Sequence, residues 1–265
     1  MGTSASSKGP GAGVSFDPPW LDDIDIPALD KQNNNMNPAI GIAPKARFRS
    51  ARKNMGEYVR SGSRDSARKS LGHYSKNGMG GAQNVARRMR TSTKTASNFF
   101  NTFRSLRDDT TFSLGKEILE LKNRGAGASE IIDAIVSHVC PKGGSVDEVS
   151  CRDSGTAALS EFMDQNPDAD FNNLSDDQIW SLMAIYLGNE TFNRIQMDIG
   201  QAFEKQDVPY VDRVTRLNDM REYIQSEIAT QMDALRKTAD QNVDMNQLFQ
   251  DTINKIGRAS CRERV

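Results

Sequence analysis

The spacing of apolar residues predicts helices along most of the chain. Over residues 47–60 the apolar side chains recur every three or four positions, and residues 67–74 continue this period up to a glycine-rich turn at 78–81. A longer helix is predicted over residues 83–106, where a polar run at 91–95 weakens the periodic signal. The side chains expected to face inward in these three helices include Phe48, Ala51, Met55, Tyr58, Val59, Leu71, Val85, Met89, Phe99 and Phe103.

The second half of the chain has clear helix start signals. Ser145 with Glu148, and Ser175 with Gln178, match the capping box, in which two side chains satisfy the first unpaired amides of a helix. The last long helix carries apolar residues from Val211 and Val214 onward. The expected helices cover 114–123, 130–140, 146–165, 176–206 and 208–237.

No segment alternates polar and apolar residues as a strand does. The predicted fold class is therefore all-α, a helical bundle preceded by a disordered N-terminal arm.

Charge is segregated along the chain, although the net charge is only -1. Residues 1–44 hold two Lys/Arg against five Asp/Glu, residues 45–107 hold sixteen against two, and residues 108–265 hold sixteen against twenty-eight. This pattern predicts a Gly/Pro/Ser/Asn-rich arm (1–44), a basic helical segment (45–107) and an acidic helical bundle (108–255). Residues 256–265 resemble a translated sequencing adapter, so we expect the natural C-terminus to be missing.

Membrane and secreted classes are not expected. No stretch approaches the roughly 18–20 apolar residues that span a bilayer, and no signal-peptide core follows Met1, which predicts a cytoplasmic protein without a membrane partner. Three cysteines are too few for a disulfide framework, so Cys140 and Cys151 are expected to be reduced thiols.

Two groupings resemble metal sites but lack essential parts. His138, Cys140 and Cys151 have no paired C-x-x-C spacing and are better explained as buried helix residues than as zinc ligands. The start of a calcium loop at Asp168, Asp170 and Asn172 lacks the glycine and the glutamate that complete such a loop, since Asn173 and Ile179 stand there.

Two further features resemble parts of enzymes. The turn at 78–81 lacks the Gly-Lys-Ser/Thr of a phosphate-binding loop, and His73 has no carboxylate near it in sequence. We therefore expect no catalytic residues and no cofactor, hence a protein that is not an enzyme.

The basic segment is the grouping with a clear physical consequence. Such a cluster attracts nucleic-acid phosphates, but an acidic partner or the chain's own acidic half satisfies it equally well, so both alternatives stay open. Its residues on successive predicted helices include Arg47, Arg49, Arg52, Lys53, Arg87, Arg88 and Arg90.

The arm carries two features of its own. Removal of Met1 is expected to expose the α-amine of Gly2, and the start also fits a short myristoylation pattern. Trp20, flanked by prolines and acids, is typical of a docking peptide.

Short motifs follow one another in order from Met1 to about residue 254. They include Met1-Gly2-Thr3-Ser4, Pro19-Trp20-Leu21-Asp22-Asp23, Arg47-Phe48-Arg49, Leu71-Gly72-His73-Tyr74, Ala86-Arg87-Arg88-Met89, Asp133-Ala134-Ile135-Val136 and Phe192-Asn193-Arg194. In this order they resemble the QatB family of the Qat anti-phage defence system.

The resemblance implies a role and a set of partners. Qat systems contain an ATPase, a TatD-like nuclease and QatC, a QueC-like enzyme understood to attach a 7-deazaguanine base to the N-terminus of QatB. Carried onto this chain, the acceptor is the Gly2 amine. Thr3, Ser4 and Ser6 are then expected to be recognised by the enzyme, with Trp20 anchoring the arm.

Overall fold

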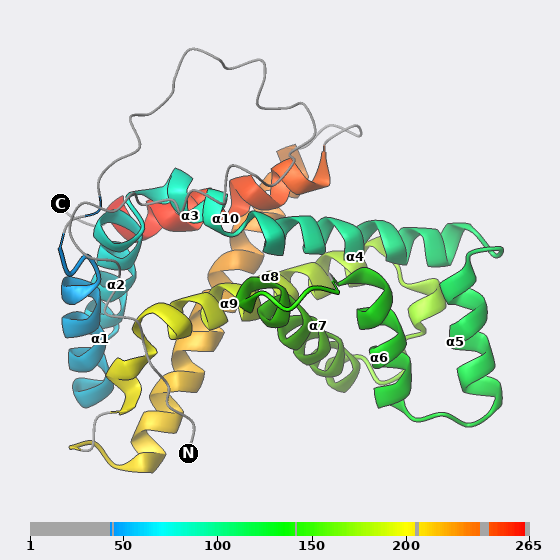
Figure 1. The fold of residues 1–265 in the computed structure, drawn as a ribbon, viewed down its shortest axis with the longest axis horizontal. Helices are drawn as coiled ribbons and strands as arrows, with labels where there is room; N and C mark the ends of the chain where they lie inside the picture. The colour runs from blue at the N-terminus through cyan, green and yellow to red at the C-terminus, as the bar shows by residue number, and fades with distance from the viewer. Residues whose placement is uncertain (1–42, 44, 141, 205–206, 239–243, 263–265) are drawn as a thin grey trace. The chain divides into compact units, whose positions relative to one another are not determined.

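Every regular element in the described part of the computed structural model is a helix, which confirms the all-α prediction. The structure describes residues 43, 45–140, 142–204, 207–238 and 244–262, so Gly2, Thr3, Ser4, Ser6 and Trp20 lie outside it. In chain order (Figure 1) the elements are α1 (Arg49–Ser61), α2 (Arg64–His73), the π-helical turn η3 (Tyr74–Gly78), α3 (Ala82–Arg88), α4 (Arg90–Asp108), α5 (Ser113–Asn123), α6 (Ala128–Val139), α7 (Val146–Gln165), the 3-10 turn η4 (Phe171–Asn173), α8 (Asp176–Ile199), the 3-10 turn η5 (Gly200–Glu204), α9 (Tyr210–Thr238) and α10 (Met245–Arg262).

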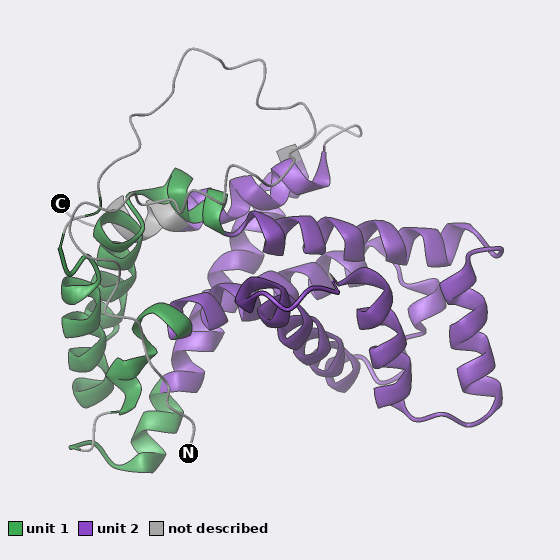
Figure 2. Ribbon diagram, in the orientation of Figure 1, with its two compact units in different colours: residues 1–88, 197–216, 257–265 green, residues 89–196, 217–256 purple. Residues whose placement is uncertain are grey.

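The chain divides into two compact units (Figure 2). Unit 1 comprises residues 1–88, 197–216 and 257–265, and unit 2 comprises residues 89–196 and 217–256. Each unit therefore combines segments that are far apart in the sequence.

The apolar face of α1 forms the centre of unit 1. Ala51, Met55 and Val59 are each at most 1% exposed, as their helical spacing predicts. The α2 residue Ser70 donates a 2.8 Å hydrogen bond to the Ala51 carbonyl, which fixes α2 against α1.

The turn between α1 and α2 is built from local sequence signals. Gly62 adopts a left-handed conformation (φ 68°) and its N–H donates to the Tyr58 carbonyl, so the turn requires a residue without a Cβ. Ser63 then caps α2 by accepting from the Ser66 N–H.

Aromatic rings fill the centre of unit 2. Phe99 of α4 lies 5.2 Å from Tyr186 of α8, and Phe103 lies 5.9 Å from Phe171 of η4, which in turn contacts Phe162 of α7. These contacts join three helices and the 3-10 turn around one apolar core.

Both predicted capping boxes are present. Ser145 and Glu148 exchange hydrogen bonds at the start of α7, and the Ser175 N–H donates to Gln178 while the Gln178 N–H donates to Ser175 at the start of α8. The starts of these helices are thus set by local sequence.

The predicted helix over 83–106 is wrong as a single element. The helix is interrupted at Met89, between α3 and α4, and not in the polar run at 91–95. Ser92, Thr93 and Thr95 of that run are buried inside α4. Two of its buried hydroxyls have hydrogen-bond partners that make this possible: Thr93 donates to the Arg90 carbonyl and Ser92 donates to Glu190.

The apolar spacing of α9 (Tyr210–Thr238) does not lead to burial at its start. Val211 is 72% exposed and Val214 is 37% exposed, whereas Met220, Ile224 and Ile228 further along the helix are buried. Among the helices of the described residues, none combines the length and apolarity that crossing a membrane requires.

Candidate functional site

Two arginines of the basic segment pack inside unit 1. The Arg47 side chain is buried and its guanidinium lies 4.9 Å from the centre of the Phe48 ring. Arg52 lies 5.9 Å from the same ring and donates a 2.9 Å hydrogen bond to the Asp198 carbonyl. The structure therefore brings Arg47 and Arg52 together around Phe48, where their charges support packing.

Other cations of unit 1 face solvent. Arg49 and Lys53 are exposed and lie one helical turn apart on α1. Further along, Arg60 pairs with Glu57 at 2.8 Å, and on α2 Lys69 pairs with Asp65 at 2.6 Å. We call Arg49 and Lys53 the α1 basic pair.

The cluster Arg87, Arg88 and Arg90 is divided by the helix break at Met89. Arg87 and Arg88 end α3 in unit 1, and Arg90 begins α4 in unit 2. All three side chains are half-buried. Adjacency in the sequence therefore does not give them a common helix face.

An exposed apolar patch lies on the first turns of α9. It consists of Tyr210 (72% exposed), Val211 (72%) and Val214 (37%), and we call it the α9 patch. The Arg213 guanidinium lies 5.6 Å from the Tyr210 ring. Sequence periodicity missed the patch, because these residues continue the apolar spacing of the buried part of the same helix.

The α9 patch adjoins the C-terminal end of α1. Tyr58 donates to the Arg216 carbonyl at 2.9 Å, and Arg60 approaches Asp207 at 3.9 Å. The Arg216 guanidinium packs so closely on Gly62 that a Cβ there would lie 2.5 Å from it. Basic side chains thus border an apolar surface within unit 1.

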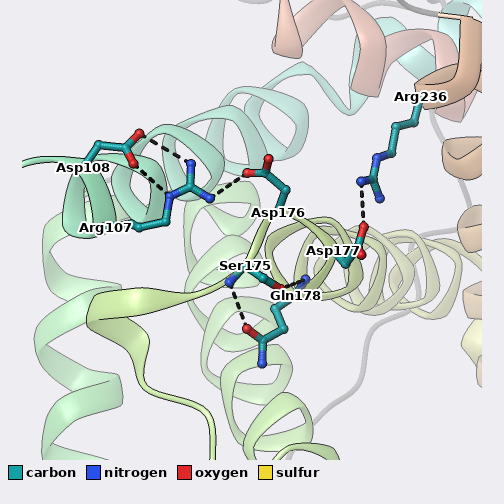
Figure 3. Close-up of polar contacts among 7 residues, drawn as sticks. All are labelled: Arg107, Asp108, Ser175, Asp176, Asp177, Gln178 and Arg236. Atoms are coloured by element: carbon teal, nitrogen blue, oxygen red, sulfur yellow. Dashed lines mark hydrogen bonds and ion pairs between the residues drawn. The ribbon is translucent and has the colours of Figure 1, made fainter.

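In unit 2, acidic residues at the start of α8 pair with arginines of two other helices (Figure 3). Arg107 of α4 contacts Asp176 at 2.7 Å, and Arg236 of α9 contacts Asp177 at 2.7 Å. Arg236 also lies 5.4 Å from the Trp180 ring. Arg107 belongs to the predicted basic segment, so at this position the chain's own acidic half pairs with that segment.

A buried carboxyl group lies inside unit 2. Glu190 of α8 is 2% exposed and accepts hydrogen bonds from Ser92 of α4 (2.9 Å), Ser150 of α7 (3.0 Å) and Ser154 of α7 (2.7 Å). Asn193 donates to Ser154 at 2.9 Å and extends this network. Burial raises the pKa of Glu190, which the three hydroxyl donors partly oppose. The sequence pattern gives no sign of this network, because its members come from three helices.

Cys140 and Cys151 are buried, as expected. His138 is exposed, so the prediction that it is a buried helix residue is wrong. Burial raises the pKa of the Cys140 thiol to about 12 and that of Cys151 to about 11, so both remain protonated and unreactive near neutral pH. The His138 ring packs edge-on to Phe112, 5.4 Å away.

Asp170, one of the calcium-loop candidates, caps η4. It accepts from the Asn172 N–H at 2.9 Å and from Lys122 at 2.6 Å. In the part of the chain that the structure describes, no three His, Cys, Asp or Glu side chains converge as metal ligands would.

Comparison with known proteins gives one match. The family model described as "Qat anti-phage system associated protein QatB" matches residues 80–257, about two thirds of the chain. No curated protein and no solved structure matches the chain.

Proposed function

The chain belongs to the QatB family of the Qat anti-phage system, and we propose that within such a system it is the protein substrate of QatC, with the Gly2 amine as the acceptor. In this role it contributes no catalytic residue and acts in the cytoplasm. Family membership is the observation that carries the proposal, and the Met1-Gly2 start of the sequence supplies an acceptor that agrees with it.

The acceptor chemistry needs little from this chain. An N-terminal amine has an ordinary pKa of about 7.7–8.0, so roughly a tenth of it is neutral at pH 7 and able to attack. QatC activates a deazaguanine carboxylate with ATP, and the Gly2 nitrogen forms a C–N bond to the activated carbonyl carbon. The leaving group departs from that carbon, and the amine loses a proton.

Neighbouring residues of the arm have separate tasks in this proposal. Thr3, Ser4 and Ser6 offer small side chains and backbone groups for recognition by QatC, while Trp20 anchors the arm. The helical units remain outside the active site, where their surfaces are available to the Qat ATPase and the TatD-like nuclease.

Intact mass spectrometry after co-expression with the cognate QatC tests this proposal. We expect a mass increase on the peptide that begins at Gly2, located by fragmentation to the terminal amine. A Gly2→Leu variant is the matched control. Its larger side chain prevents removal of Met1, so the nitrogen of residue 2 stays in a peptide bond and cannot act as the acceptor. An unmodified Gly2 terminus in the presence of active QatC would overturn the proposal.

The exposed α1 basic pair favours a second candidate function. Its side chains are available to phosphate groups, which agrees with a nucleic-acid adaptor that guides the nuclease or with a scaffold for the ATPase and nuclease. This function is compatible with modification of Gly2, since it uses a different part of the chain.

A further inference from the structure

We propose that the α9 patch is the docking site for residues 17–30 of the same chain. These residues lie outside the described part of the structure, and the inference concerns how the arm is held, whether or not Gly2 is modified. Three features support it: the composition of the segment, the composition of the surface, and the length of chain between them.

The segment combines acid and apolar residues. Residues 17–30 contain five Asp and no Lys or Arg. Its large apolar side chains are Trp20, Leu21, Ile24, Ile26 and Leu29. A partner for it must therefore offer an apolar surface with positive charge around it.

The α9 patch has this composition. Tyr210 and Val211 are each 72% exposed on adjacent positions, and Val214 adds its side chain one turn later. Arg213 lies on the Tyr210 ring and the Arg216 guanidinium lies against Gly62. Asp212 is exposed on the same helix and opposes this charge locally.

The charge around the patch favours an acidic occupant. Residues 45–88, which supply the first helices of unit 1, hold twelve Lys/Arg against two Asp/Glu. Asp207, three residues before α9, already approaches Arg60 at 3.9 Å. Residues 197–216 of the same unit add three Lys/Arg and four Asp/Glu, so the two segments together hold fifteen basic residues against six acidic ones. Their field is therefore positive, opposite in sign to that of residues 17–30.

The connecting chain is long enough. Twelve residues, 31–42, separate Asp30 from Ala43, and when extended they reach up to about 40 Å. The α9 patch adjoins the far end of α1 from Ala43, and the 13 residues of α1 span about 20 Å. Docking also leaves residues 1–16 as a free leader that can present Gly2 to an enzyme.

Photo-crosslinking of the full-length chain without QatC tests the docking. The photoreactive residue p-benzoylphenylalanine replaces Val211, and peptide mass spectrometry identifies the segment that it captures. We expect an adduct within one chain, to a peptide from residues 17–30. An adduct between two chains, or to another segment, overturns the proposal.

The matched control places the same residue at Val146 of α7, another surface valine (68% exposed) at a helix start. Capture of residues 17–30 from position 146 with equal yield overturns the proposal, because it shows unselective contact. Replacing the five Asp of the segment by Asn should lower the yield at position 211 about fivefold, since each screened surface charge contributes little alone. An unchanged yield in that variant also overturns it.

Discussion

Glu190 shows how one buried residue joins three helices of unit 2. The hydroxyls of Ser92, Ser150 and Ser154 donate to its two carboxylate oxygens, and the side chain is 2% exposed. Burial disfavours the charged form of the carboxyl group and raises its pKa, whereas the hydroxyl donors stabilise the charged form and lower the pKa. The residue therefore fixes the positions of α4, α7 and α8. It also lowers the stability of the fold at pH values where its carboxyl group is charged.

This cost predicts a pH dependence. The folded-state pKa of Glu190 lies above its unfolded value, so the folded state holds the proton more tightly. The stability that this contributes is present below the unfolded pKa and is lost as the pH rises through the folded pKa. Compared with Glu190→Gln, the wild type should lose unfolding free energy over that pH range in urea titrations. An identical pH profile for both proteins would contradict the prediction.

A Glu190→Ala variant serves as the control for the hydroxyl network. It leaves a cavity and three buried hydroxyls without their acceptor, and we expect a loss of about 3–5 kcal/mol. Glu190→Gln keeps the shape and an acceptor oxygen, so it should cost less than about 1.5 kcal/mol.

At the scale of elements, α8 and α9 approach closely within unit 2. A Cβ on Gly188 of α8 would lie 2.6 Å from the Gln225 Cγ and 3.1 Å from its Cα. The Gln225 amide donates to Asn189 and to Glu161, each at 3.2 Å, and so joins α9 to α8 and α7. Glycine is tolerated inside α8 because it permits this approach.

Alanine at Gly188 should therefore destabilise the protein by about 1–3 kcal/mol, although alanine is the better helix former. Thermal unfolding measures the effect. Gly115 of α5 is the matched control, because its Cβ would meet only Leu106 Cδ2 at an ordinary 3.5 Å. Gly115→Ala should be neutral or stabilise by up to about 1 kcal/mol, and equal effects at both sites would contradict close packing as the cause.

At the scale of the whole molecule, charge is separated along the sequence and partly neutralised within each unit. The basic residues that remain exposed include the α1 basic pair, whereas Arg107 pairs with Asp176 and Arg47 is buried. The net charge of -1 therefore conceals a surface that can attract polyanions.

Binding to duplex DNA should consequently depend on salt and on the α1 basic pair. Reversal of Arg49 and Lys53 to Glu should weaken binding at least about tenfold at low salt. Two attractive contacts to phosphates are lost, and the new carboxylates repel those phosphates. Fluorescence anisotropy at several salt concentrations measures it. The same reversal at Lys116 and Lys142, both exposed in unit 2, is the control.

Equal losses in the two double variants, or binding that does not change with salt, would contradict this second function. Reversal of the half-buried Arg87, Arg88 and Arg90 then reports how far that cluster contributes. Modification of Gly2 should be the same in all of these variants.

Local sequence determined most of the helices and both capping boxes, because these depend on residues within one or two turns, but it did not predict α10 (Met245–Arg262). It also indicated the QatB family, which the family match over 80–257 confirms. Only the tertiary structure decided that the helix is interrupted at Met89, that Arg47 is buried and that Val211 is exposed. Periodicity shows which face of a helix is apolar, but burial depends on which distant segments cover that face. The Glu190 network has the same origin, since three helices must pack before its four side chains can meet.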